Sequence, residues 1–172
     1  MNYKVKLNKI KAFVFDYDGV LSDGCIYTVD DKVIARSGNV KDGYAIQHAL
    51  KKGYKVAVLS GGKGDSIVKR AEMLGIKDIF ISAADKKEIY LKYIEQNELS
   101  NDEVLYMGDD IPDFDIMELA GVCTCPADAA WEIKQRADYI SKNNGGCGCV
   151  RDVIEQVLRL HGQWFNEDSK LW

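Results

Sequence analysis

Apolar residues recur along this chain in short runs separated by longer amphipathic stretches. The clearest run is Phe13–Phe15, which has the pattern of a buried strand and ends abruptly at Asp16. The predicted strands cover residues 13–15, 56–59, 79–81, 104–107, 122–125 and a short piece at 139–140. Helical spacing of apolar residues predicts helices over 42–52, 65–74, 86–96, 112–120, 129–136 and 150–161.

This alternation of strands and helices with short connections predicts an α/β fold with a doubly wound, mostly parallel sheet. Residues 24–36 depart from it, because apolar positions alternate loosely there around the acidic pair Asp30 and Asp31. That pattern predicts a small β-hairpin insertion. We expect one domain over residues 1–162, followed by a loosely held C-terminal tail over 163–172.

The composition is that of an ordinary globular domain, with 172 residues, 47% hydrophobic and 29% charged. A net charge of −4 supplies no basic face, which argues against nucleic acid as a partner. No apolar run approaches the roughly 20 residues of a membrane span, and the N-terminus lacks the apolar core of a signal peptide. We therefore expect a cytoplasmic protein that contacts no membrane.

The five cysteines do not predict a metal or disulfide framework. Cys123 and Cys125 are separated by one residue, as are Cys147 and Cys149, whereas thiolates of structural zinc sites are usually spaced by two or more. Cys123 and Cys125 lie in an apolar stretch. We expect them to be small core residues of a strand.

Polar residues gather at the carboxyl ends of the predicted strands, where ligands bind in open α/β sheets. They are Asp16 and Asp18 after the first strand, Ser60 and Gly61 after the second, Lys86 at the start of the helix after the third, and Asp109, Asp110 and Asp113 after the fourth. Carboxylates that converge without compensation repel one another, so the set predicts a bound divalent cation such as Mg²⁺. A carboxylate nucleophile, a hydroxyl and a lysine are the groups that phosphoryl transfer uses.

The segments Asp16-Tyr-Asp18-Gly-Val, Ser60, Lys86 and Gly108-Asp109-Asp110-Ile-Pro-Asp113 resemble, in order, the four motifs of the haloacid dehalogenase superfamily phosphatases. Only the 24–36 hairpin stands where larger members carry a cap domain, which resembles the capless subgroup. Over nearly its whole length the chain is similar to the 3-deoxy-D-manno-octulosonate 8-phosphate phosphatases, including the stretches 21–24, 39–44, 70–75, 145–146 and 150–152.

The resemblance implies a Mg²⁺-dependent phosphatase acting on a sugar-acid phosphate, in the synthesis of cell-surface lipopolysaccharide. It implies that Asp16 is the nucleophile and a metal ligand, and that Asp18 is the general acid and base, with its backbone carbonyl on the metal. Asp109 would be the remaining metal ligand, and Asp110 and Asp113 would lie next to the metal ligands without binding the metal directly. Ser60 and Lys86 would bind the phosphoryl group. It places Asp42, Gly43, Gly61, Lys63 and Arg70 near the substrate. It also implies a homotetramer, with the Gly145-Gly146 segment reaching into a neighbouring subunit's site.

Two positions depart from the family pattern: Gly62 and Cys147 stand where octulosonate phosphatases usually carry arginine, the natural partner of a sugar-acid carboxylate. The leaving group therefore stays open between an eight-carbon sugar acid, a nine-carbon one and another small phosphate ester. Asp42 and Asp110 also suit helix caps, and Arg70 a plain helix face. A signalling receiver would require a different order of its acidic residues and lysine, and a silent scaffold would normally have lost Asp16 or Asp18.

Overall fold

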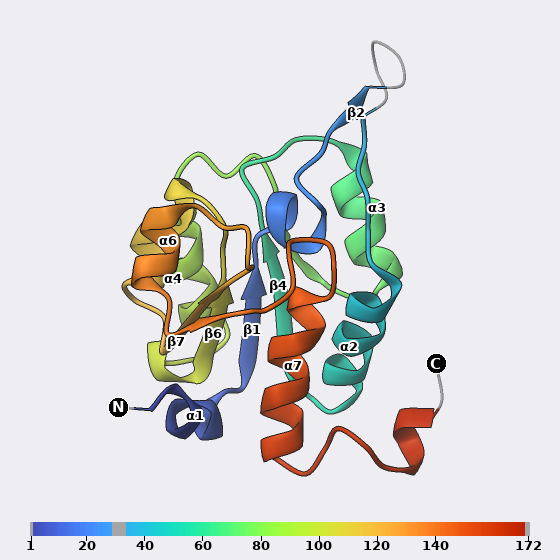
Figure 1. Cartoon of the computed structure of the whole chain (residues 1–172), viewed down its shortest axis with the longest axis vertical. Coiled ribbons are helices and arrows are strands. Elements are labelled where there is room, and N and C mark those ends of the chain that lie inside the picture. The colour runs from blue at the N-terminus through green and yellow to red at the C-terminus, as the bar shows by residue number, and fades with distance from the viewer. Residues whose placement is uncertain (1, 29–33, 171–172) are drawn as a thin grey trace.

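A computed structural model describes residues 2–28 and 34–170 of the chain (Figure 1). The strands are β1 (Ala12–Phe15), β2 (Tyr27–Thr28), β3 (Ile34–Ala35), β4 (Lys55–Leu59), β5 (Asp78–Phe80), β6 (Val104–Met107), β7 (Val122–Cys125) and β8 (Tyr139–Ile140). The helices are α1 (Tyr3–Lys6), α2 (Val40–Lys51), α3 (Asp65–Met73), α4 (Lys86–Gln96), α5 (Phe114–Met117), α6 (Trp131–Arg136) and α7 (Cys149–Leu160). Shorter helical turns are η1 (Leu7–Lys9), η2 (Tyr17–Leu21), η3 (Asn101–Glu103), η4 (Ile111–Asp113) and η5 (Glu167–Lys170).

The predicted doubly wound sheet is confirmed. In the described residues, six parallel strands lie in the order β5-β4-β1-β6-β7-β8. The chain adds strands on one side of β1 and then returns to add the rest on the other side. The strand order therefore reverses next to β1, which is where ligands bind in sheets of this kind.

Helices cover both faces of this sheet (Figure 1). Because side chains alternate along a strand, Phe13 and Phe15 of β1 pack into one core with α2, α3 and α7, while Ala12 and Val14 pack into the other with α4, α5 and α6. Every residue of β1 is buried. Burial on both faces gives the continuous apolar strands that the sequence shows.

Two predicted helices differ in the structure. The helix expected over 42–52 begins at Val40, because Asn39 caps it by accepting hydrogen bonds from the backbone of Lys41 and Asp42. The helix expected over 112–120 is two short pieces, η4 and α5, because Asp110 and Asp113 form a reciprocal capping box that tightens the first turn. Helix α1 was not predicted, since its four residues are too few for a periodic pattern.

The hairpin of β2 and β3 pairs antiparallel and projects from the body of the molecule (Figure 1). Its predicted turn at Asp30 and Asp31 lies outside the described residues. Ile26, Tyr27 and Ile34 are exposed on it. These apolar side chains therefore do not pack into the core of their own chain.

Part of the tail that we expected to be loosely held packs against the body of the chain, while Phe165 in the same tail is 79% exposed. Trp164 is buried and packs edge-on against the rings of Tyr44 and His48. The ring Nε2 of His48 lies 2.9 Å from the carbonyl oxygen of Gln163. The large side chain of Trp164 covers the core beside α2. The expectation that the end of a chain is loosely held did not take this residue into account.

The Gly145-Gly146 segment packs against its own chain, and its reach into a neighbouring subunit's site stays a prediction. The backbone N–H of Gly146 donates to the carbonyl of Val20 at 2.9 Å, and the Asn39 side chain donates to the carbonyl of Gly146 at 3.2 Å. Gly145 is buried beside Gly19. The segment thus supports the turn that follows β1 in the same molecule.

The cysteines behave as core residues where this was predicted. Cys123 and Cys125 are buried in β7, and all five cysteines, which lie within the described residues, carry free thiols. In the part of the chain that the structure describes, no helix is both long and apolar enough to cross a bilayer.

Candidate active site

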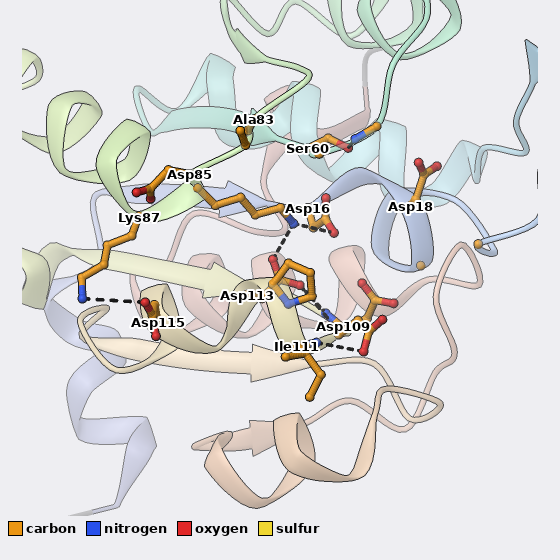
Figure 2. Close-up of a pocket in the computed structure, with 18 residues that line it drawn as sticks. Asp16, Asp18, Ser60, Ala83, Asp85, Lys87, Asp109, Ile111, Asp113 and Asp115 are labelled. Carbon is orange, nitrogen blue, oxygen red and sulfur yellow. Dashed lines mark hydrogen bonds and ion pairs between the residues drawn. The ribbon is translucent and has the colours of Figure 1, made fainter.

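An open cavity of about 790 Å³ lies at the carboxyl ends of β1, β4 and β6. Its lining combines the residues that the sequence pointed to at these strand ends (Figure 2). They are Asp16, Asp18, Ser60, Gly61, Lys86, Asp109, Asp110 and Asp113, joined by Gly19, Gly24, Gly62, Ala83, Ala84, Asp85, Lys87, Ile111, Pro112 and Asp115. The parallel register brings these distant segments to one edge of the sheet.

Lys86 links two carboxylates from different elements. Its Nζ lies 3.0 Å from Asp16 Oδ2 and 2.7 Å from Asp113 Oδ1, and all three side chains are buried. Lys86 starts α4, whose N-cap Asp85 accepts from the backbone of Glu88. The helix start thereby aims the ammonium group at the end of β1.

Asp113 is fully engaged by donors of the protein itself. Its Oδ1 accepts from Tyr106 at 2.6 Å as well as from Lys86, and its Oδ2 accepts from the backbone of Asp109 at 3.0 Å and Asp110 at 3.3 Å. Four donors occupy the lone pairs that a carboxylate offers. Asp113 therefore positions Lys86 and the Asp109-Asp110 backbone.

Asp109 completes the cluster. Asp16, Asp109 and Asp113 each offer a carboxylate oxygen, and these atoms lie within 4.8 Å of one another. Gly19, with φ of +83°, makes the approach possible, because a Cβ there would lie 2.0 Å from Asp109 Oδ2. The glycine of the first motif is thus needed for the close packing of this site.

The electrostatics of the cluster call for a cation. Burial, followed by the charges of Asp16 and Asp113, raises the pKa of Asp109 to about 8. Burial and the charge of Asp113 likewise raise the pKa of Asp16, against the opposing effect of Lys86. Burial alone would lower the pKa of Lys86, but Asp16 and Asp113 outweigh it and the pKa is raised. One ammonium group does not compensate three adjacent carboxyl groups.

The donor set fits a hard divalent cation. Asp16 and Asp109 offer carboxylate oxygens that the protein leaves partly free, whereas Asp113 is saturated. Oxygen-only ligands suit Mg²⁺ rather than a thiophilic metal. Mg²⁺ is accordingly the cation that this set of side chains accommodates.

Asp18 and Ser60 line the same cavity at other points (Figure 2). The Asp18 carboxylate points away from the Asp16–Lys86 pair and toward the segment after β4. The buried hydroxyl of Ser60 accepts from the backbone of Gly62 at 3.0 Å. The cavity thus has carboxylates on two sides and a hydroxyl beside them.

A family model described as haloacid dehalogenase-like hydrolase matches residues 75–154. The 3-deoxy-D-manno-octulosonate 8-phosphate phosphatase of Escherichia coli (strain K12) is 34% identical over 158 residues, covering 92% of this chain and 84% of that protein. The chain belongs to this hydrolase family. Its members in these comparisons are phosphatases, so the chain is a phosphatase of the haloacid dehalogenase-like hydrolases.

Solved structures agree with this membership. The 3-deoxy-D-manno-octulosonate 8-phosphate phosphatase of Yersinia pestis superposes with a TM-score of 0.91 at 29% identity, covering 93% of this chain and 86% of that one. The same phosphatase from Moraxella catarrhalis, in complex with a magnesium ion, a phosphate ion and a KDO molecule, gives 0.89 at 30% identity, with 92% of both chains covered. The magnesium ion of that structure agrees with the oxygen-only acidic cluster found in this chain.

Some predicted substrate residues of this hydrolase lie outside the main cavity. Asp42, Gly43 and Arg70 line a separate and much smaller cavity beside Tyr17. Asp42 is buried and caps α7 rather than its own helix, since Gly148 and Arg151 donate their backbone N–H groups to it. Lys63 is exposed. Contact of these residues with substrate stays a prediction.

Asp110 is confirmed as a helix cap, while its predicted role beside the metal stays a prediction. It lines the cavity and caps η4, because its Oδ1 accepts from the backbone of Ile111 at 2.8 Å. The sequence reasoning missed Tyr106 and Arg36, which hold Asp113 and Asp18. The alternation of side chains along the strand could have placed Tyr106 on the same face as Val104. For Arg36 no local pattern points to the site.

Proposed function

We propose that this chain hydrolyses 3-deoxy-D-manno-octulosonate 8-phosphate through a phosphorylated Asp16 with the help of Mg²⁺. The observation that carries the proposal is the convergence of Asp16, Lys86 and Asp109 at one end of the sheet, in a cavity open to solvent. The choice of substrate is supported by the similar 3-deoxy-D-manno-octulosonate 8-phosphate phosphatases and by the KDO molecule bound in the Moraxella catarrhalis structure.

In the first step, a carboxylate oxygen of Asp16 attacks phosphorus and the bond from phosphorus to the sugar oxygen breaks. Asp18 gives a proton to that oxygen, so that the sugar leaves as an alcohol. Lys86, the Ser60 hydroxyl and the backbone N–H groups near Gly61 hold the oxygens of the transferring group. The product is an acyl phosphate on Asp16.

In the second step, water attacks the phosphorus and the bond to the Asp16 oxygen breaks. Asp18, now a carboxylate, takes the proton from the water, and inorganic phosphate leaves. Both residues return to their starting state. One aspartate thus serves as acid and then as base, which requires that it sit on the leaving-group side of phosphorus, away from the nucleophile.

Asp16, Asp109 and the backbone carbonyl of Asp18 would hold Mg²⁺, which neutralises phosphate charge and draws the phosphoryl group to the nucleophile. Asp113 keeps Lys86 and the Asp109 backbone in place. Removing Asp113 or Tyr106 is therefore expected to disturb the metal and the lysine together.

A nine-carbon sugar-acid 9-phosphate, or another small phosphate ester, is the alternative substrate. The reason to test it is that Gly62 and Cys147 replace the arginines that the family pattern leads one to expect as partners of the sugar-acid carboxylate. With the eight-carbon substrate, we propose a role in lipopolysaccharide synthesis in the cytoplasm.

The test is phosphate release from a panel of phosphorylated sugar acids and neutral sugar phosphates, with Mg²⁺ and with EDTA. We expect the eight-carbon sugar acid to give the highest kcat/KM and EDTA to abolish turnover. A higher kcat/KM for the nine-carbon ester would transfer the assignment to it. Full activity after exhaustive chelation would contradict the metal-dependent mechanism.

We also propose a homotetramer assembled through the hairpins. Support comes from Ile26, Tyr27 and Ile34, which are 56%, 53% and 41% exposed on a projecting hairpin. Sedimentation should give four chains per particle, and Tyr27→Lys should reduce that number. A fully active monomer at assay concentration would contradict this proposal.

A further inference from the structure

Arg36 follows β3 at the base of the hairpin and forms a two-pronged ion pair with Asp18. Its Nε donates to Asp18 Oδ1 at 2.6 Å and its Nη2 donates to Asp18 Oδ2 at 3.2 Å. A planar guanidinium group that meets both oxygens fixes the plane of the carboxylate as well as its position.

Arg36 is itself held rigidly. Its side chain is only 2% exposed, and its Nη1 donates to the Ser66 hydroxyl on α3 at 3.1 Å. Arg36 is also absent from the lining of the cavity, whereas Asp18 lines it and is 28% exposed. Because Arg36 lies behind Asp18, it can act on the chemistry only through Asp18.

The two oxygens of Asp18 have different surroundings. Oδ1 accepts from Ser22 at 3.3 Å in addition to Arg36, so both of its lone pairs are used. Oδ2 has Arg36 as its one donor in the described residues, through the longer contact. Oδ2 also lies where Gly62 leaves space, because a Cβ built on Gly62 would be 2.7 Å from it.

We propose that Arg36 is a positioning residue for the general acid, holding Asp18 so that Oδ2 is the atom that exchanges the proton with the leaving group and the water. In this chain Gly62 places no side chain beside Oδ2, and both residues line the cavity. The inference rests on the proposed function and adds the residues that orient Asp18.

The experiment compares kcat/KM for phosphate monoesters whose leaving groups differ in basicity, from p-nitrophenyl phosphate to the sugar phosphate. This parameter reports the steps up to loss of the leaving group. p-Nitrophenolate leaves without a proton, whereas a sugar alkoxide needs one. In Arg36→Met we expect about a tenfold or larger loss for the sugar ester and less than about threefold for the nitrophenyl ester.

Two further variants separate positioning from simple support of the fold. Asp18→Asn should show the same leaving-group dependence, and the double variant Asp18→Asn, Arg36→Met should be no worse than Asp18→Asn alone. Arg36→Lys should recover part of the sugar-ester activity, because an ammonium group can still donate to one oxygen.

Gly62→Ala tests the role of Oδ2. Its added methyl would lie 2.7 Å from Asp18 Oδ2, so Asp18 must shift, whereas Ser60 Oγ and Ile67 Cδ1 are met at the milder distance of 3.1 Å. It should lower sugar-ester turnover more than nitrophenyl turnover. Arg159→Met, which removes an exposed arginine paired with Glu155, is the matched control and should leave both unchanged.

Equal losses for both esters in Arg36→Met, or additive losses in the double variant, would overturn the inference. Those outcomes would leave the proposed function standing. An inactive wild-type enzyme with every phosphate ester would instead refute the proposed function before any variant is compared.

Discussion

At the scale of single residues, the site depends on carboxylates that have different tasks because they have different partners. Asp113 accepts from Lys86, Tyr106 and two backbone N–H groups, and is 0% exposed. Asp16 accepts from Tyr17 and Lys86 and still faces the cavity. Identical side chains thereby differ in what they can do: Asp113 is a support, and Asp16 is free to be the proposed nucleophile.

Asp16→Asn should abolish turnover, with a loss of at least about 10⁴-fold in kcat, because an amide cannot form the acyl phosphate. The fold should be retained, since the volume is unchanged. In EDTA at pH 8 we expect its melting temperature to equal or exceed that of the wild type, because a repulsive charge is gone. Substantial phosphate release by purified Asp16→Asn would refute the nucleophile assignment.

Asp113→Asn should lower kcat/KM by about 10- to 100-fold, because Lys86 and the Asp109 backbone lose a charged acceptor. The measurement is kcat/KM at several Mg²⁺ concentrations, since a displaced metal site also raises the Mg²⁺ requirement. Asp102→Asn, which removes an exposed carboxylate paired with Lys9, is the control. If both variants behaved alike, Asp113 would have no role in the site.

At the scale of elements, α2 and α7 are joined by a buried cap. Asp42 on α2 accepts from Gly148 at 3.2 Å and from Arg151 at 2.6 Å, which satisfies backbone donors at the start of α7. A negative charge at a helix N-terminus is favourable there. The Gly145-Gly146 segment, which supports the residues after β1, directly precedes this helix start. Loss of the cap is therefore expected to lower stability next to the site.

Asp42→Ala should therefore lower the free energy of unfolding by about 2 kcal/mol, measured by urea denaturation. Asp65→Ala, in the exposed first turn of α3, should change it by less than about 0.5 kcal/mol. The cap predicts a change in stability with KM unaffected. A raised KM at unchanged stability would instead support the predicted substrate contact of Asp42.

At the scale of the whole molecule, metal binding and protonation compete for one cluster. With an unfolded pKa near 3.9, a folded pKa of about 8 for Asp109 means that the folded protein binds more protons between these values. The contribution of Asp109 to the stability of the metal-free protein is then greatest below about pH 4. It is lost as the pH rises through about 8.

Mg²⁺ should reverse this dependence, because it binds the ionised cluster and displaces protons. We expect the rise in melting temperature on adding Mg²⁺ to be larger at pH 8 than at pH 6. Asp109→Asn should remove most of the difference. An equal rise at both pH values would show that the cluster does not bind the metal in competition with protons.

The pattern of residues along the chain was enough to locate the sheet and the polar residues at one of its edges. Apolar runs such as Phe13–Phe15 locate strands because a strand covered on both faces must be apolar throughout, and motifs at strand ends follow from the parallel order. Asp16, Ser60, Lys86 and Asp109 could therefore be assigned to one cavity before the structure was known.

Which distant side chains contact one another became known from the folded structure alone. Asp42 caps a helix whose first residues lie 106 positions away, Arg36 reaches Asp18 through the hairpin, and Trp164 holds the tail on α2. The spacing of apolar residues predicts which side chains are buried, because the local backbone, helix or strand, fixes which residues share a face. A pairing between distant side chains depends on how whole elements pack, and no local pattern carries that information.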